Sequence, residues 1–228
     1  MTLTQATYKA IKYACLHFHY AKAVPVSPLA YNVFNDDGEW CGVIVYSYGA
    51  NNNIGTQYNL KQGEIVELVR VALNGKQEHT SQAVSMSLKQ LHKDAPCVRL
   101  VVSYADKDQN HLGTIYQATN WLYVGDVMNK QHDSSWIVNG KRYHGRIVSE
   151  WVKKHGGLKG LTRAEFIRKY YDINATPFVT NGKRKYLMPL DKRVKKQILK
   201  HIKPYPKSDT NWEKIDRKQF DKSNINKE

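Results

Sequence analysis

Cysteine is scarce in this chain, and its thiols are arranged neither for bridging nor for zinc. The 228 residues contain three cysteines, Cys15, Cys41 and Cys97, which are widely spaced and form no Cys-x-x-Cys pair. An odd, scattered set of thiols excludes a disulfide framework and a sulfur-rich zinc site. Cys97 opens an apolar run, so we expect it to be a buried small hydrophobic residue.

Long hydrophobic runs are also absent. No segment approaches the ~20 consecutive apolar residues of a membrane span. The N-terminal stretch, MTLTQATYKAIKYACLHFHY, has no uninterrupted apolar core followed by a cleavage site. We therefore expect a soluble, cytoplasmic protein without a membrane segment.

Acidic residues are few relative to basic ones. Lys and Arg total 35 against 20 Asp and Glu, which gives a formal net charge of +15. This excess favours a polyanionic partner, either nucleic acid or an anionic membrane surface. Charge alone does not choose between these partners, nor does it exclude a protein that is simply basic and soluble.

The length and the hydrophobic content, 41%, suffice for one substantial core. We place a single domain over residues 1–207. Residues 208–228 are polar and aperiodic, which predicts a disordered tail.

The first half of the chain alternates strand and helix patterns. A strand, a helix and a second strand in succession predict a right-handed crossover between parallel strands, and with it an α/β fold. The polar segment 49–62 is either a lid beside a site or a simple connector. The expected elements are a helix over 4–16, an antiparallel hairpin of strands 31–34 and 40–48, a strand over 64–73, a helix capped by Thr80 or Ser81, a strand over 97–103, and a helix from Leu112 that stops at Gly125.

The second half begins with a hairpin signal, because Asn139-Gly140 joins two short strand-like runs. Helices follow over 146–155 and 162–171, and Thr162 with Glu165 forms a capping box at the start of the second. A second Asn-Gly pair at 181–182 predicts another hairpin. Asp191 caps a last basic helix that ends before Pro204.

Polar side chains gather where the strand at 97–103 ends. Ser103, Tyr104 and Asp106 lie at this point, and ligands of open α/β sheets bind at the carboxyl ends of strands. Asp106 is either an ordinary turn aspartate or a functional carboxylate. Tyr116, early in the next helix, is either a packing residue with one hydrogen bond or part of the same site.

Two further clusters have both a structural and a functional interpretation. His19 and Tyr20 close the first helix, where His is commonly just a cation that suits the helix C-terminus. Arg70, on an apolar strand, needs a partner such as Glu67 or Asp106, or else a phosphate or carboxylate of a ligand. Ser81 is first an N-cap, and a helix N-terminus also favours an anion.

Basic residues interleave with aromatic ones in the second half of the chain, a pattern that offers phosphate contacts and stacking faces. The alternative is a solvated basic surface with ordinary hydrophobic anchors. The residues predicted to bind DNA are Lys141, Arg142, Tyr143, Arg146, Trp151, Lys183, Arg184 and Lys185.

The segment from Ser103 to Trp121, with SYAD followed by HLGTIYQATNW, resembles the Mom family of phage DNA-modification proteins, whose fold is similar to the GNAT acyltransferases. The sequence HFHYAK at 17–22 is similar to the family's His-Tyr motif, and ELVR at 67–70 to its central strand. The resemblance extends over residues 15–205. It implies a mixed central sheet with flanking helices, in which 64–73 is the fourth strand, 97–103 the fifth and KRKYLMPL a late edge strand. Residues 133–176 are then a basic insertion.

The resemblance also implies roles for single residues. His19, Tyr20, Asp106 and Tyr116 match the proposed catalytic centre, and Arg70, Ser81 and Ser103 match positions for the donor of the transferred group. Iron has been suggested for the family, and the same four catalytic residues suit either a transition metal or an acid/base cluster. The segment NGKQEHTSQA lacks the pyrophosphate-loop pattern of GNAT enzymes, which argues against acetyl-CoA as donor.

The function that this resemblance implies is conversion of adenine N6 in double-stranded DNA to a carbamoylmethyl-type group, which protects phage DNA from host restriction. The small-molecule donor of the group is unknown. One alternative is a GNAT-type acyltransferase that uses acyl-CoA on an amine of a protein, metabolite or modified base. The other is a noncatalytic DNA-binding protein, which the charge by itself supports.

Overall fold

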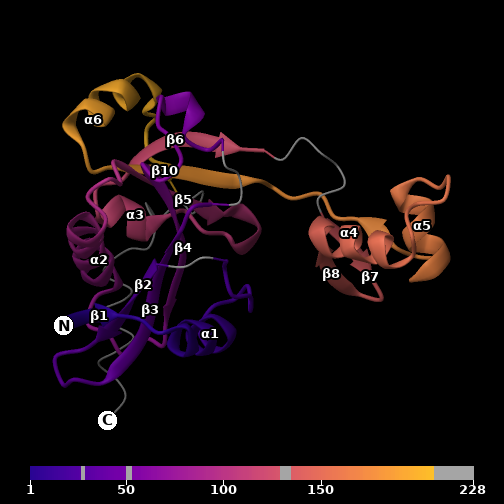
Figure 1. Ribbon diagram of the computed structural model, residues 1–228, viewed down its shortest axis with the longest axis horizontal. Helices are drawn as coiled ribbons and strands as arrows, with labels where there is room; N and C mark the ends of the chain where they lie inside the picture. The colour runs from indigo at the N-terminus through magenta and orange to yellow at the C-terminus, as the bar shows by residue number, and fades with distance from the viewer. Residues whose placement is uncertain (27–28, 50–52, 129–134, 208–228) are drawn as a thin grey trace, which may run out of the picture.

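The computed structural model describes residues 1–26, 29–49, 53–128 and 135–207. Within these residues the strands form one seven-stranded sheet with helices on its faces, and one three-stranded sheet that stands apart from it (Figure 1). The predicted class, α/β with a mixed central sheet and flanking helices, is confirmed. The predicted tail at 208–228 and the start of the predicted insertion at Asp133 lie outside the described residues.

The seven-stranded sheet is antiparallel except at its centre, where β4 and β5 run parallel as expected. The predicted hairpin at 31–48 is present as β2 and β3. In spatial order the strands are β1 (Thr2–Gln5), β2 (Leu29–Phe34), β3 (Trp40–Ser47), β4 (Ile65–Leu73), β5 (Leu100–Asp106), β10 (Lys183–Pro189) and β6 (Leu122–Val127).

Helices cover both faces of this sheet. Helix α1 (Tyr8–His17) buries Ile11, Ala14 and Cys15 against one face, and α2 (Thr80–Asp94) buries Val84, Leu88 and Leu91 against the other. A third hydrophobic cluster lies where α6 (Lys192–Ile198) and η1 (Thr56–Tyr58) pack on strands β5 and β10. The remaining elements are η2 (Lys107–Gln109), α3 (Thr114–Ala118) and η3 (Leu199–His201).

Two predicted helices are shorter than expected. An N-cap sets the start of the first, and a left-handed residue follows the end of the second. The helix expected over 4–16 begins at Tyr8, since the Thr7 hydroxyl accepts from the Ala10 backbone N–H at 3.3 Å, and residues 2–5 pair with β2 instead. The helix expected from Leu112 to Gly125 covers only Thr114–Ala118. Asn120 adopts a left-handed backbone, with φ of 59°, and the chain then enters strand β6.

The strand KRKYLMPL was expected at an edge and in a hairpin, and both expectations are wrong. Strand β10 lies between β5 and β6 and pairs with each, so β6 forms the edge. The Asn181-Gly182 pair is therefore no hairpin turn: it is where the chain returns to the large sheet. The hairpin at Asn139-Gly140 is confirmed, with both residues at positive φ, 47° and 71°.

Two other predictions need correction. Cys97 is exposed because β5 begins only at Leu100. Neither Thr80 nor Ser81 caps α2, since the N-cap is His79 and both residues lie within the first turn. In the segment 49–62, most of the described residues are exposed while Tyr58 and Leu60 are buried, and residues 50–52 lie outside the described residues.

Residues 135–180 form what we call the appendage, with a hydrophobic core of its own. The predicted capping box of Thr162 and Glu165 is present at its second helix. The core comprises Trp136, Val138, Val148, Phe166, Ile167 and Ala175. The elements are β7 (Ser135–Val138), β8 (Lys141–His144), α4 (Gly145–Lys154), α5 (Arg163–Tyr170) and β9 (Thr176–Pro177).

Strands β4 and β5 diverge soon after they meet. In the described structure they pair over Ile65–Glu67 and Leu100–Val102 alone. Beyond that point β4 follows β3 and β5 follows β10, so a wedge opens between them. The Ser103 hydroxyl bridges the start of the wedge by donating to the Leu68 carbonyl oxygen at 2.7 Å. This divergence creates the space for the site.

Candidate functional site

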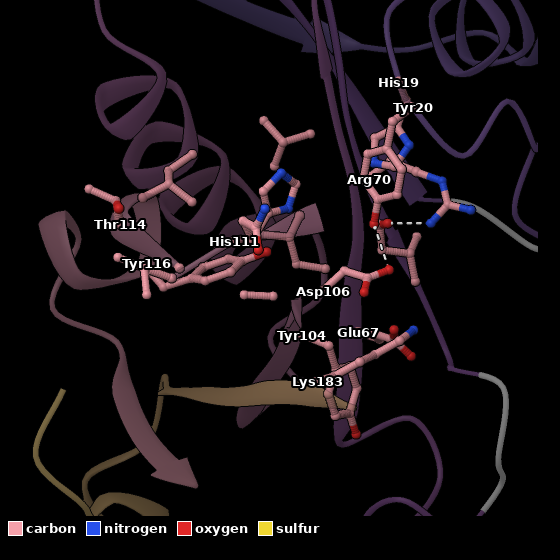
Figure 2. Close-up of a pocket in the computed structure, with 18 of the residues that line it drawn as sticks. His19, Tyr20, Glu67, Arg70, Tyr104, Asp106, His111, Thr114, Tyr116 and Lys183 are labelled. Carbon is pink, nitrogen blue, oxygen red and sulfur yellow. Dashed lines mark hydrogen bonds between the residues drawn. The ribbon is translucent and has the colours of Figure 1, made fainter. Parts of the chain in front are cut away.

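A cavity of about 480 Å³ occupies the wedge between β4 and β5. This volume lies within the range typical of small-molecule sites. Its walls come from the end of α1, from residues 67–71 of β4, from the end of β5, from residues 110–116 and from Lys183. Figure 2 shows side chains of these distant segments pointing toward one another.

Asp106 and Tyr20 form the contact that joins the N-terminal segment to β5. The Tyr20 hydroxyl lies 3.5 Å from Asp106 Oδ2, and Asp106 Oδ1 accepts from the Asp108 backbone N–H at 3.0 Å (Figure 2). Burial, and then the neighbouring Asp106, raise the pKa of Tyr20. Tyr20 is therefore a neutral phenol that can donate to the carboxylate.

His19 is positioned by the turn that follows α1. Its Nδ1 accepts from the Ala21 backbone N–H at 3.1 Å, and its ring stacks on Tyr20 with centroids 4.4 Å apart. Burial, with the positive charge of Arg70 next in size, lowers the pKa of His19 to about 4. The imidazole is therefore neutral at pH 7 and presents Nε2 as the remaining ring nitrogen.

Arg70 is held by backbone carbonyls rather than by an acid. Its guanidinium donates to Val69 O at 2.7 Å and to Ala23 O at 3.4 Å. The predicted partners Glu67 and Asp106 form no ion pair with it among the described residues. The charge of Arg70 is therefore available to an anionic group in the cavity.

Tyr116 reaches the cavity because the turn before α3 packs closely on β10. Gly113 has φ of +78°, and a Cβ there would lie 2.4 Å from Cε2 of Tyr186, so only glycine permits this approach. The Tyr116 hydroxyl lies 2.7 Å from Ser103 Oγ. Burial raises the pKa of Tyr116 to about 12, which keeps the phenol neutral.

The structure brings most of the predicted site residues together. His19, Tyr20, Arg70, Asp106 and Tyr116 all line the cavity. Ser103 is buried behind them and supports Tyr116. Ser81 does not line the cavity, so its predicted donor contact has no support in this geometry.

The predicted DNA-binding residues fall into several environments. Lys141 and Arg146 are exposed on the appendage, whereas Tyr143 and Trp151 pack on its core. The others are engaged elsewhere: Arg142 pairs with Asp108, Lys183 lines the cavity, Arg184 donates to His111 O, and Lys185 is 8% exposed and lies over the Tyr58 ring.

The sequence did not place Glu67, His111 and Lys183 at the site, although all three line the cavity. Tyr104 also lines it, as its position at the end of the strand predicted. Glu67 gave a signal, because it is a charged residue on an apolar strand. Lys183 was predicted to bind DNA, but nothing in the sequence placed it at the cavity, since its position depends on β10 pairing with β5, where Lys183 lies opposite Asp106.

Among the described residues, no group of three or more His, Cys, Asp or Glu side chains lies at a spacing that holds a metal ion. His19, Tyr20, Asp106 and Tyr116 provide only two donors of these types. The two predicted alternatives for these four residues, a transition-metal site and an acid/base cluster, both stay predictions.

Within the described part of the chain, no helix combines the length and the apolar character needed to span a membrane.

Comparison with known proteins adds three similarities. The methylcarbamoylase Mom of Escherichia phage Mu is 29% identical over 176 residues, which cover 73% of this chain and 67% of that protein. A mutant of the spermidine N-acetyltransferase SpeG from Vibrio cholerae is 9% identical, with a TM-score of 0.45 over 88% of this chain and 99% of the other. A Bacillus subtilis acetyltransferase in complex with CoA is 13% identical, with a TM-score of 0.44 over 83% and 97% of the two chains.

The family signal extends over the whole described body of the molecule, the cavity and the appendage included. A model of the Mom protein family matches residues 1–207. The chain belongs to the Mom protein family.

Proposed function

We propose that this chain is a phage DNA-modification transferase that converts adenine N6 in DNA to a carbamoylmethyl-type derivative and so protects the DNA from restriction. Membership of the Mom family and the similarity to a methylcarbamoylase support it. The observation that carries the proposal is the convergence of His19, Tyr20, Arg70, Asp106 and Tyr116, from separate parts of the sequence, on one cavity.

Adenine presents a specific chemical difficulty. The lone pair of N6 is delocalised into the ring, and the amino group lies inside the duplex, so the base must leave the stack before it can react. A cavity of about 480 Å³ has room for a flipped base with a small donor group beside it. The aromatic rings of Tyr20 and His111, with centroids 5.6 Å apart, lie at this cavity and suit contact with a planar base.

Asp106 is the proposed general base. Its Oδ2 faces the cavity beside Tyr20, while Oδ1 is held by the backbone N–H of Asp108. The carboxylate takes the proton that N6 loses as the new N6–C bond forms. In the same reaction the bond between that carbon and the donor's leaving group breaks, and the leaving group departs with the electron pair of that bond. Tyr20 holds the carboxylate in place by its hydroxyl, and the neutral imidazole of His19 and the phenol of Tyr116 orient the base.

Arg70 is the proposed contact for the donor. Its guanidinium has carbonyl partners but no acidic one among the described residues. An anionic phosphate or carboxylate on the donor satisfies this charge. The rival acyl-CoA reaction would show itself as tight, saturable binding of CoA.

Mass spectrometry of nucleosides tests the proposal. DNA from cells that express this chain, with the donor pathway of the natural host supplied, should contain a new deoxyadenosine species whose mass gives the transferred group. Asp106→Ala should abolish that species and leave the melting temperature and DNA binding nearly unchanged. A fully active Asp106→Ala variant contradicts the role of Asp106, and unaltered nucleosides with the intact protein contradict the proposed function itself.

A further inference from the structure

The appendage is strongly basic relative to its size. Residues 135–180 include nine basic residues against three acidic ones. The basic residues are Lys141, Arg142, Arg146, Lys153, Lys154, Lys159, Arg163, Arg168 and Lys169, and the acidic ones are Glu150, Glu165 and Asp172. A surface of this charge suits a polyanion.

Two of the three acids serve the structure of the appendage itself. Glu165 completes the capping box at the start of α5. Asp172 accepts from the backbone N–H groups of Asn139 at 2.7 Å and Asn174 at 2.9 Å. Glu150 is therefore the acid that remains to oppose an approaching phosphate.

Three cations on α4 are presented to solvent and have no such structural role. Arg146, Lys153 and Lys154 are exposed, while Val148, on the opposite face, is fully buried. Arg146 and Lys153 are seven residues apart, which places them ~10 Å apart along the helix axis. Other cations of the appendage have local partners: Arg163 donates to Ser149 Oγ, and Arg168 to Ala175 O.

The appendage is fixed to the rim of the cavity by Asp108. The carboxylate of Asp108 is 6% exposed and pairs with Arg142 at 3.2 Å. It also accepts from the Thr180 hydroxyl at 2.9 Å and from the Asn181 backbone N–H at 2.9 Å. The backbone N–H of Asp108 in turn donates to Asp106. Lys183, at the start of β10, lies opposite Asp106 of β5. The appendage stands off the large sheet beyond this end of β10 (Figure 1).

We propose that the exposed face of α4, with Arg146, Lys153 and Lys154, binds the phosphate backbone of the DNA duplex that flanks the base held in the cavity. This inference rests on the proposed function, because the surface holds the duplex beside the cavity in which the base reacts. A flipped base leaves its neighbours in the helix, so the enzyme needs contacts to the flanking backbone to hold the duplex while the base is out. Phosphate contacts of this kind position the DNA without reading its sequence.

Binding of a short labelled duplex, measured by fluorescence anisotropy at several salt concentrations, tests the surface. Replacing Arg146, Lys153 and Lys154 by Gln should weaken binding roughly tenfold or more and reduce the slope of log K against log salt by about 2 to 3, one step for each lost phosphate contact. The matched control replaces Lys61, Lys89 and Lys93, which are exposed elsewhere on the protein, by Gln. It carries the same change in net charge.

Glu150→Lys provides the opposite test, because a misfolded protein does not bind DNA better. Adding a cation to the same face should strengthen binding and steepen the salt slope by about 1. If the triple variant binds with the affinity and slope of its control, or Glu150→Lys binds no tighter than the wild type, the surface assignment is wrong. If the wild type leaves adenine unmodified, that result contradicts the proposed function and does not bear on the DNA-binding surface.

Discussion

Glu67 illustrates how position in the fold alters the chemistry of one side chain. It lies on β4, where Arg70 is the one other charged residue, lines the cavity and forms no ion pair among the described residues. Burial raises its pKa, and the positive charges of Lys183 and Arg70 only partly oppose that shift. A carboxyl group with a raised pKa in a cavity is a candidate for proton transfer, so Glu67 stands beside Asp106 as a second titratable acid of the site.

The raised pKa of Glu67 has a consequence for stability. The folded protein binds the Glu67 proton more tightly than the unfolded chain does, so this residue costs stability as the pH rises above the ordinary carboxyl pKa. Gln has no proton to lose. Glu67→Gln should therefore raise the melting temperature at pH 8 and change it little at pH 4, whereas exposed Glu150→Gln should change it little at both. A variant less stable than the wild type at pH 8 would show that attraction to Lys183 and Arg70 outweighs burial.

At the scale of elements, the segment after β5 joins the cavity to the appendage. Burial would by itself raise the pKa of Asp108, but hydrogen bonds from Asn181 and Thr180 and the charge of Arg142 hold it below the ordinary value. Asp108 therefore stays ionised and keeps its partners at neutral pH. Arg142 also lies 3.9 Å over the Phe178 ring, so one guanidinium fixes both η2 and the segment that leads into β10.

Removing Arg142 should loosen this junction without unfolding the large sheet. Arg142→Ala eliminates the ion pair and uncovers Phe178, so chymotrypsin should cleave after Phe178 several-fold faster than in the wild type. Lys141→Ala, at the neighbouring exposed position, should leave the cleavage rate unchanged. Cleavage products are identified by mass spectrometry. Equal rates for Arg142→Ala and wild type would mean that Asn181 and Thr180 suffice to hold the junction.

At the scale of the molecule, the hydrophobic residues divide between the large sheet and the appendage. The clusters around the large sheet contain residues from β1 to β6, β10 and the flanking helices, whereas the appendage cluster contains only residues 136–175. The polar junction at Asp108 connects the two. Because the core of the appendage is small, we expect its free energy of unfolding to be low.

Phe166 tests this division, because its ring is 1% exposed within the appendage core. Phe166→Ala should cost about 3–5 kcal/mol, enough to open the appendage while the large sheet stays folded. Hydrogen exchange followed by mass spectrometry should show faster exchange in β7, β8, α4 and α5 and unchanged exchange in β3, β4 and β5. Faster exchange throughout both sheets would instead indicate one cooperative unit.

The sequence by itself determined the features whose energetics are local. The Asn139-Gly140 turn, the Thr162 and Glu165 capping box and the Asp191 cap depend on a few consecutive residues, and each was predicted correctly. The parallel pairing of β4 and β5 followed from the strand, helix, strand order. The catalytic set of His19, Tyr20, Asp106 and Tyr116 came from the family resemblance, and its proposed role awaits the nucleoside measurement.

The tertiary structure alone decided the features that depend on partners distant in the sequence. Strand β10 entered the sheet between β5 and β6, which brought Lys183 to the cavity and buried Lys185 beside Tyr58. Arg142 was engaged by Asp108, and Ser81 was left away from the cavity. The physical reason is that strand pairing and burial are set by non-local contacts, whose free energy cannot be read from the neighbours of a residue along the chain.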